Sequence, residues 1–402
     1  MRRLYNLQTH SQTNRGNSYG LQSAAREIGT QLSAPRIRAN GKVKFISLPD
    51  AKNKTEANRA LARIVTEMDT GNFIEPNKTT VAEFLQRWLD HIKTQVQRRT
   101  HIGYTEKAQQ LIPRLGSIPL SKLKPEQISA AYSTALDSGR RDGKAGGLSP
   151  RSIHHMHRVL VQALGQAMKW GAINRNVAAL VDPPKVERAE MKTLNVDQAT
   201  TMIEALRGET IFIPVLLGLL CGLRRGEICA VRWRNINLDT GQLSVVASIE
   251  EAKGGMREKS PKNGRGRTVA LPPMLITELR RHRLQQAEWL LRLGVRLTDD
   301  HYINLRQDGQ TVWPASIAAA FRSFLRTHNL PRIRFYDLRH SHATHMLAGG
   351  VHPKIAQERL GHSSISITLD TYSHCMPNMQ ADATATIDAA FQAAMNKREQ
   401  NR

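Results

Sequence analysis

Cysteine is scarce in this chain of 402 residues. Only Cys221, Cys229 and Cys375 occur, and no two of them form a Cys-x-x-Cys pair. The sequence therefore lacks the closely paired cysteines typical of a disulfide framework or of a cysteine-based zinc site. We expect reduced thiols, two of them buried among apolar or small residues.

Long apolar runs are also missing. The longest, IFIPVLLGLLCGL at residues 211–223, is too short to span a bilayer and predicts a buried helix. The opening residues, MRRLYNLQTH, lack the apolar segment of a secretory signal. No GxxxxGKT loop that would cradle a nucleotide occurs in the chain. These absences predict a cytoplasmic protein whose chemistry is not driven by ATP.

Acidic side chains are few compared with basic ones. The chain has 58 Lys and Arg residues against 34 Asp and Glu, which gives a formal net charge of +24. A protein this basic is expected to bind a polyanion, with DNA or RNA the leading candidate. An anionic membrane surface is the alternative, but the basic amphipathic helix or lipid anchor that it would require is not evident.

A β-hairpin is predicted near the N-terminus, within PRIRANGKVKFISL at residues 35–48. A three-residue loop at 40–42 is preferred to a two-residue loop because it keeps apolar side chains together on one face. The resulting cross-strand pairs are Ile37 with Phe45, Ala39 with Val43, and Arg38 with Lys44, the last two side chains being candidate DNA contacts.

A helix is predicted after the hairpin, in residues 54–69, where apolar residues recur at helical spacing. A helix on one face of the hairpin would leave the basic face free. We therefore predict a small DNA-binding domain over residues 1–72, of which residues 1–33 are polar and expected to be poorly ordered. An ordinary solvated hairpin is the alternative.

A helical domain is predicted for residues 77–182. Its first helix begins at Thr80, which forms a capping box with Glu83, and further helices are expected near residues 100–112, 125–137 and 150–170. The last of these places Arg151 and Arg158 on an outward face, where they would contact phosphates or simply be solvated. Paired prolines and charges then mark a linker at 181–192. Residues 190–402 mix helices with short strands, at 241–249 and 267–272, on either side of a basic loop.

Three histidines crowd the segment YDLRHSHATHML at residues 336–347. A zinc-protease helix would instead carry two histidines four residues apart with a glutamate between them. That pattern is absent, so a metal site is the less favoured interpretation. We expect Arg339 to be the important residue of this segment, with the histidines as packing or supporting groups.

Four segments of residues 190–402 together resemble the tyrosine recombinase family of the phage-integrase type. They are CGLRRGEICAVRW at 221–233, SPKNGRGRTVALP at 260–272, YDLRHSHATHML at 336–347 and LGHSSISITLDTYSH at 360–374. The resemblance implies a multidomain chain, mainly α with small β-sheets. It further implies an N-terminal arm-binding domain, a helical, SAM-like core-binding domain, and a mixed α/β catalytic domain.

The resemblance also implies roles for individual residues. Two arginines would stabilise the phosphate, an acidic residue would orient the site, a lysine would act as general acid, a histidine would follow Leu-Gly, and a tyrosine would form a 3′-phosphotyrosine bond. The residues that match are Arg224, Arg339, Glu227, Lys262, His362 and Tyr372. The family usually has His-x-x-Arg around the second arginine, whereas this chain has Tyr336. Tyr336 is therefore a candidate catalytic-site residue by position. A phenol is a poor base at neutral pH, so the general base is left open, and His340 is not expected simply to replace the family histidine.

This family acts on double-stranded DNA, as a homotetramer, without metal or other cofactors, and in some members with DNA-bending or directionality proteins. The same functions are expected here, for integrating or excising a mobile element. A type IB topoisomerase-like enzyme and a catalytically inactive DNA-binding protein are the alternatives. The Ala-rich segment 381–400 carries Ile387, Phe391 and Met395 at a spacing of four, and would pack on its own domain or on a neighbouring protomer.

Overall fold

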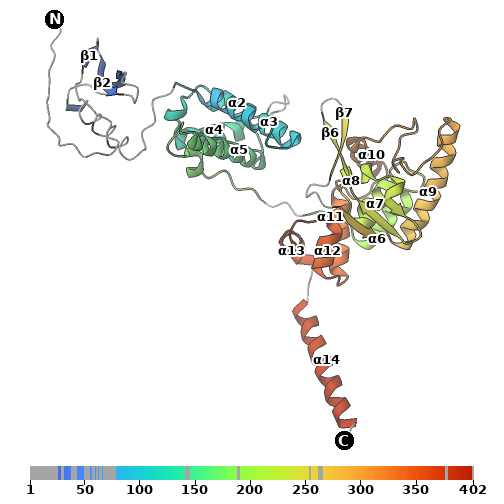
Figure 1. Ribbon diagram of the computed structural model, residues 1–402. Coiled ribbons are helices and arrows are strands. Elements are labelled where there is room, and N and C mark those ends of the chain that lie inside the picture. The colour runs from blue at the N-terminus through green and yellow to red at the C-terminus, as the bar shows by residue number, and fades with distance from the viewer. Residues whose placement is uncertain are drawn as a thin grey trace. The chain divides into compact units, whose positions relative to one another are not determined.

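The structure, a computed structural model, describes most of the chain beyond residue 77. The described ranges are 26–28, 31–37, 43–48, single residues between 55 and 66, 78–140, 145–187, 191–252, 255–260, 266–375 and 379–400. Residues 1–187 and 188–402 form two compact units. Figure 1 shows α2–α5 in the first unit and α6–α13 with the small sheets in the second.

A three-stranded antiparallel sheet, in the order β1-β2-β3, opens the first unit. Its strands are β1 (Arg26–Ile28), β2 (Gln31–Ile37) and β3 (Val43–Leu48). Within residues 1–33, which were expected to be poorly ordered, β1 and the start of β2 are assigned as strands. β1 has only three residues, and the sequence around it is polar. It is therefore too short to show the alternation of apolar and polar residues that would predict a strand.

The predicted hairpin exists, but its register differs by two residues. Ile37 pairs with Val43, and Lys44 lies opposite Arg36 instead of Arg38. The physical reason is that a shift of two preserves which side chains share a face, so hydrophobic alternation does not distinguish the two registers. Arg38 lies outside the described residues. Of the predicted helix at 54–69, residues 55, 56, 59, 62 and 66 are described, and they are helical.

The described residues between 78 and 187 contain the four expected α-helices: α2 (Val81–Ile92), α3 (Arg98–Leu115), α4 (Pro125–Ser138) and α5 (Pro150–Lys169). The capping box is confirmed, because Oε2 of Glu83 accepts from the Thr80 amide at 2.8 Å and Oγ1 of Thr80 accepts from the Glu83 amide at 3.3 Å. The apolar faces of the four helices pack together in one core. Arg151 and Arg158 lie exposed on the outer face of α5.

In the described part of the second unit, eight α-helices and two small sheets precede the last helix. The helices of its body are α6 (Val196–Ala205), α7 (Phe212–Cys221), α8 (Arg225–Ala230), α9 (Pro273–Arg292), α10 (Pro314–Thr327), α11 (Asp337–Ala348), α12 (Pro353–Leu360) and α13 (Ile365–Tyr372). α7 is the predicted buried helix and packs against α8, α9 and α11. Cys221 and Cys229 are buried and unpaired, as expected.

The sheets correct one prediction. β4 (Ile236–Asn237), β5 (Gln242–Val245) and β8 (Arg267–Ala270) form one sheet, and β6 (Ser248–Ala252) pairs with β7 (Gly255–Lys259). The expected single strand at 241–249 is thus divided between two sheets, and β7 lies in the segment predicted as a loop. β7 reads GMREK, whose polar composition hides its pairing with β6.

The last helix, α14 (Met379–Gln400), keeps its apolar stripe in contact with solvent. Ile387, Phe391 and Met395 are 59%, 64% and 58% exposed, so these three side chains are not packed on the helix's own domain. Among the described helices, none is both long enough and apolar enough to cross a membrane.

Candidate active site

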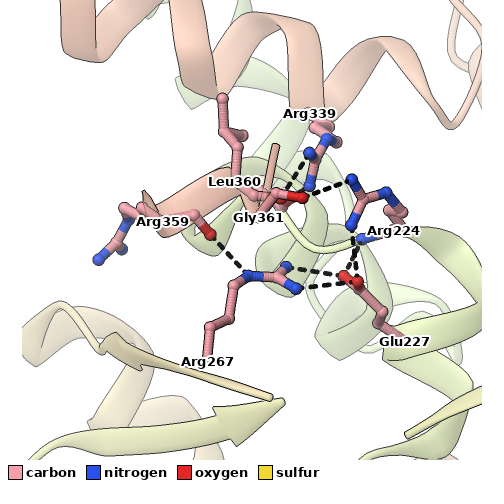
Figure 2. Close-up of polar contacts among 8 residues, drawn as sticks. Arg224, Glu227, Arg267, Arg339, Arg359, Leu360 and Gly361 are labelled. Atoms are coloured by element: carbon pink, nitrogen blue, oxygen red, sulfur yellow. Dashed lines mark hydrogen bonds and ion pairs between the residues drawn. The ribbon is translucent and has the colours of Figure 1, made fainter. Parts of the chain in front are cut away.

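A buried carboxylate with two arginine partners forms the centre of the site. Glu227 of α8 is 4% exposed. Its Oε1 accepts from Nη1 of Arg224 at 2.9 Å, and its two oxygens accept from Nη1 and Nη2 of Arg267 at 2.9 and 2.8 Å (Figure 2). The backbone amide of Arg224 adds a fourth hydrogen bond, to Oε2 at 2.8 Å. Glu227 therefore fixes Arg224 at both its side chain and its backbone.

These partners keep Glu227 ionised. Burial by itself would raise the pKa of this carboxyl, but the hydrogen bonds and charge of Arg267, followed by those of Arg224, outweigh it and lower the pKa to about 2. The glutamate therefore remains negatively charged at neutral pH and offsets part of the arginine charge around it.

The C-terminal end of α12 holds three arginines together. Its last carbonyl groups lack partners within the helix and carry partial negative charge, which suits them to guanidinium donors. Gly361 ends the helix at φ +66°, a left-handed conformation that favours glycine. As Figure 2 shows, the pairs are Arg359 O with Arg267 Nε at 2.8 Å, Leu360 O with Arg339 Nη2 at 2.6 Å, and Gly361 O with Arg224 Nη2 at 3.1 Å.

Arg339, on α11, is the most deeply buried of these cations. It is 1% exposed, and its Nη1 also donates to the carbonyl of Gly222 at 2.6 Å. Burial, and then the nearby charge of Arg224, lowers the pKa of Arg339 to about 10, so it is still charged at neutral pH. Its buried Nε has no hydrogen-bond partner among the described residues. One donor of Arg339 is therefore free for an anion.

Tyr372 ends α13 and is buried next to α11. It is 1% exposed, and its hydroxyl lies 2.6 Å from Nδ1 of His340. Burial raises the pKa of Tyr372, while the charge of Arg339 opposes that rise. The contact with His340 therefore joins Tyr372 to the residue that directly follows Arg339 on α11.

His362 also lies in the field of the arginines. Its Nδ1 is 2.8 Å from Oγ1 of Thr368 on α13. Burial, and then the charges of Arg339 and Arg224, lowers the pKa of His362 to about 4. His362 is therefore neutral at pH 7.

Tyr336 lies at the edge of this network. Tyr336 is 48% exposed, and its ring meets that of His340 edge-on with centroids 4.9 Å apart. Lys262 lies outside the described residues. The structure thus gathers Arg224, Glu227, Arg339, His362 and Tyr372, and leaves Tyr336 at the edge of the site.

The three histidines of the 336–347 segment have three different partners. His340 contacts Tyr372, and Nε2 of His345 lies 2.7 Å from the carbonyl of Leu194. In His342, Nε2 accepts from Nε of Arg359 at 3.1 Å, so Nδ1 carries the proton and donates to Leu219 O at 2.9 Å. Over the ranges described, no three His, Cys, Asp or Glu side chains cluster in a way that could hold a metal.

Sequence analysis missed the roles of two residues. Arg267 was overlooked although it lies in the 260–272 segment, directly after the basic loop. His340 was expected to be a packing or supporting group, but it contacts the hydroxyl of Tyr372 directly. The only feature of the sequence that could have indicated this contact is the position of His340, directly after Arg339.

Known proteins resemble this chain in sequence and in fold. Residues 191–379 match the model of the phage integrase family, and residues 80–135 match the phage integrase N-terminal SAM-like domain. A "Tyrosine recombinase XerC-like" protein of Caldanaerobacter subterraneus is 26% identical over 362 residues, which cover 85% of this chain and 90% of that protein. "Tyrosine recombinase XerA" of Pyrococcus furiosus is 30% identical over 256 residues, which cover 62% of this chain and 78% of that protein.

Two solved structures share the fold. A Tn1549 transposon integrase in complex with transposon right end DNA has a TM-score of 0.65 at 20% identity, covering 77% of this chain and 99% of that one. A lambda integrase tetramer bound to a Holliday junction has a TM-score of 0.55 at 18% identity, covering 85% and 92%. The predicted fold class, mainly helical with small antiparallel sheets, is confirmed. This chain belongs to the phage integrase family of tyrosine recombinases.

Proposed function

We propose that this recombinase cuts and rejoins double-stranded DNA through a covalent bond between the hydroxyl oxygen of Tyr372 and a 3′-phosphate, and thereby integrates or excises a mobile element. The observation that carries the proposal is that buried Tyr372 contacts His340, the residue after Arg339, while Arg339 and Arg224 both bind the C-terminal end of α12. A tyrosine nucleophile keeps the energy of the broken phosphodiester bond in the covalent link, so rejoining needs neither ATP nor a metal ion.

The two arginines would bind the phosphate under attack. Negative charge on its non-bridging oxygens suits planar, permanently charged guanidinium groups with several donors. The side chain of Arg224 is 39% exposed and can meet DNA directly. The unpaired Nε of Arg339 offers a buried donor that a phosphate oxygen would satisfy.

DNA access requires a movement of the buried tyrosine. Arg339 and Tyr372 are each 1% exposed. The nucleophile must therefore leave its buried position before it can reach a phosphate in line with the leaving oxygen. α13, which ends at Tyr372, is the element we propose to move.

The other site residues would support this chemistry. Glu227 would hold Arg224 in place through its paired hydrogen bonds. Lys262 would protonate the leaving 5′-oxygen as general acid. His362, neutral at pH 7, would supply a hydrogen bond and no charge.

Basic side chains elsewhere would hold the DNA backbone. Arg151 and Arg158 are exposed on α5. His155 lies between them in sequence, and its pKa is lowered first by burial and then by nearby positive charges that include both arginines. This effect indicates that positive charge is concentrated on this face. Lys44 on β3 and Arg38 beyond β2 would contact DNA from the N-terminal sheet. We propose three domains accordingly: 1–72 for arm-type sites, 77–182 for the core site, and 190–402 for catalysis.

The assembly on DNA would be a homotetramer. The exposed apolar stripe of α14, at Ile387, Phe391 and Met395, is suited to pack on a neighbouring protomer. Strand exchange between two duplexes requires four cuts, one for each protomer. DNA-bending or directionality proteins would assist the reaction, which would take place in the cytoplasm.

A nicked suicide substrate tests the proposal. The DNA that flanks the gene supplies the site, and the nick lets the cut strand diffuse away so that the covalent adduct accumulates. Wild type should give an adduct on a denaturing gel, and Tyr372→Phe should bind DNA without forming one. Absence of a wild-type adduct would overturn the proposal, and relaxation of plasmids without site preference would favour a topoisomerase.

A further inference from the structure

We infer that His340 is the general base that takes the proton from Tyr372 when the tyrosine attacks DNA. The inference rests on the proposed function, because it assigns the proton acceptor of that reaction. It gives this chain a base although Tyr336 occupies the position where the family usually has a histidine.

The geometry of the two side chains suits proton transfer. The Nδ1 atom of His340 and the hydroxyl of Tyr372 are 2.6 Å apart, which is at the short end of the range for a general base and its proton. With the imidazole proton on Nε2, Nδ1 accepts this hydrogen bond from the phenol. Because Tyr372 is 1% exposed in this position, His340 is placed to take the proton as the tyrosine leaves its buried position for the phosphate.

The surroundings of His340 favour its neutral, accepting form. Burial lowers its pKa, and the cations Arg334 and Arg339 act in the same direction, while Asp337 opposes them. Among the described residues, the titratable side chains of Tyr336, Tyr372 and His362 also face it. At neutral pH the imidazole is therefore uncharged, and its Nδ1 lone pair is available.

Tyr336 lies one helical turn before His340. Tyr336 precedes α11 but has helical backbone angles of φ −67° and ψ −26°. Because His340 follows four residues later, the two side chains lie on the same face of the helix. A base one turn along the helix can serve the same nucleophile. The edge of one ring meets the face of the other at 78°, so Tyr336 supports the imidazole by packing.

In the proposed step, one proton moves from Tyr372 to His340 and another moves from Lys262 to the leaving oxygen. The O–H bond of Tyr372 breaks and its proton moves to Nδ1 of His340, while the phenol oxygen forms a bond to phosphorus. The bond between phosphorus and the 5′-oxygen breaks, and the leaving oxygen takes a proton from Lys262. Rejoining reverses each transfer, with the imidazolium of His340 returning its proton to the phenol.

Matched variants separate proton transfer from hydrogen bonding. His340→Asn places an amide oxygen near the position of Nδ1, so it keeps an acceptor that is not basic, while His340→Ala removes the acceptor. We would measure single-turnover adduct formation on the suicide substrate from pH 5 to 9. His340→Asn should slow the reaction about 10²-fold or more at pH 7, the range of general-base catalysis. DNA affinity and the melting temperature should stay near wild type.

The pH profile gives a readout that packing would not change. In wild type the rate should fall as the pH drops through the pKa of His340, below 6.5, because the protonated imidazole cannot accept a proton. His340→Asn should lack this acid limb, and added imidazole should partly restore His340→Ala. Tyr336→Phe keeps the aromatic packing on the imidazole and should keep the limb.

A modified substrate distinguishes the base from the acid. A 5′-bridging sulfur is a good leaving group without protonation, so it should rescue Lys262→Ala but leave His340→Asn slow. A His340→Asn rate within about three-fold of wild type at every pH would overturn the inference. Failure of wild type itself to form an adduct, or an adduct from Tyr372→Phe, would instead overturn the proposed function.

Discussion

Arg267 binds Glu227 through two parallel hydrogen bonds, of 2.9 and 2.8 Å, although 40 residues separate them in sequence. Their side chains are 13% and 4% exposed. Because the same carboxylate also holds Arg224, the strand that carries Arg267 helps to position an arginine of the candidate active site.

Replacing Arg267 should therefore destabilise the second unit. Arg267→Ala leaves the buried carboxylate with one cationic partner, and we expect a loss of about 3 kcal/mol, at the lower end for breaking a buried ion pair. The matched control is Arg280→Ala, whose partner Asp239 is 94% exposed, and which should cost less than about 1 kcal/mol. Thermal unfolding of the full chain checks both, and equal effects would contradict a structural role for Arg267.

Acid should weaken the fold through Glu227. Its folded pKa of about 2 lies below its ordinary value of 4.5, so its contribution is fully present above pH 4.5 and is lost as the pH falls toward 2. The difference corresponds to about 3 kcal/mol. Melting temperatures measured between pH 2 and 6 should fall less steeply for Glu227→Gln than for wild type. Identical slopes would show that Glu227 does not titrate in this way.

The outer face of α5 should contribute to DNA affinity without regard to sequence. Arg151→Ala and Arg158→Ala should each weaken binding to core-site and unrelated DNA alike, and reduce the slope of log K against log salt by about 1. Arg292→Ala on α9, whose side chain is 75% exposed and paired with Glu288, is the control. Titrations at several salt concentrations supply the slopes. Unchanged slopes would show that Arg151 and Arg158 do not contact DNA and are only solvated.

Removal of residues 1–72 should separate the two kinds of DNA binding. The truncated chain should still form the covalent adduct at a core site, because the four helices α2–α5 and the second unit have their own cores. It should lose affinity for a distant arm-type site, which filter binding or a mobility shift would detect. Loss of core-site cleavage by a truncated chain that stays folded would refute the proposed domain division.

Local signals in the sequence predicted much of this fold. Thr80 and Glu83 mark the start of α2 within four residues, and Arg224 and Glu227 lie close enough in sequence for their contact to be anticipated. Caps, apolar stripes and the paired prolines are likewise read within single segments. Such features need no knowledge of the tertiary structure.

Contacts between distant segments could not be predicted in this way. His340 and Tyr372 meet across 32 residues, and nothing in the period of either helix requires the contact. The register of β2 with β3 was missed because a slip of two residues keeps every side chain on its face. β7 was missed because polar residues form it, and only its pairing with β6 identifies it as a strand.

The most direct test of the account identifies the residue that carries the DNA. Trypsin cuts after lysine and arginine, so Tyr372 falls in the peptide 360–397 and Tyr336 in the separate peptide 335–339. The trapped adduct would be digested with trypsin and nuclease and examined by mass spectrometry. We predict a nucleotide attached to Tyr372 in peptide 360–397. Attachment to Tyr336, or to any other residue, would contradict the assignment of the nucleophile.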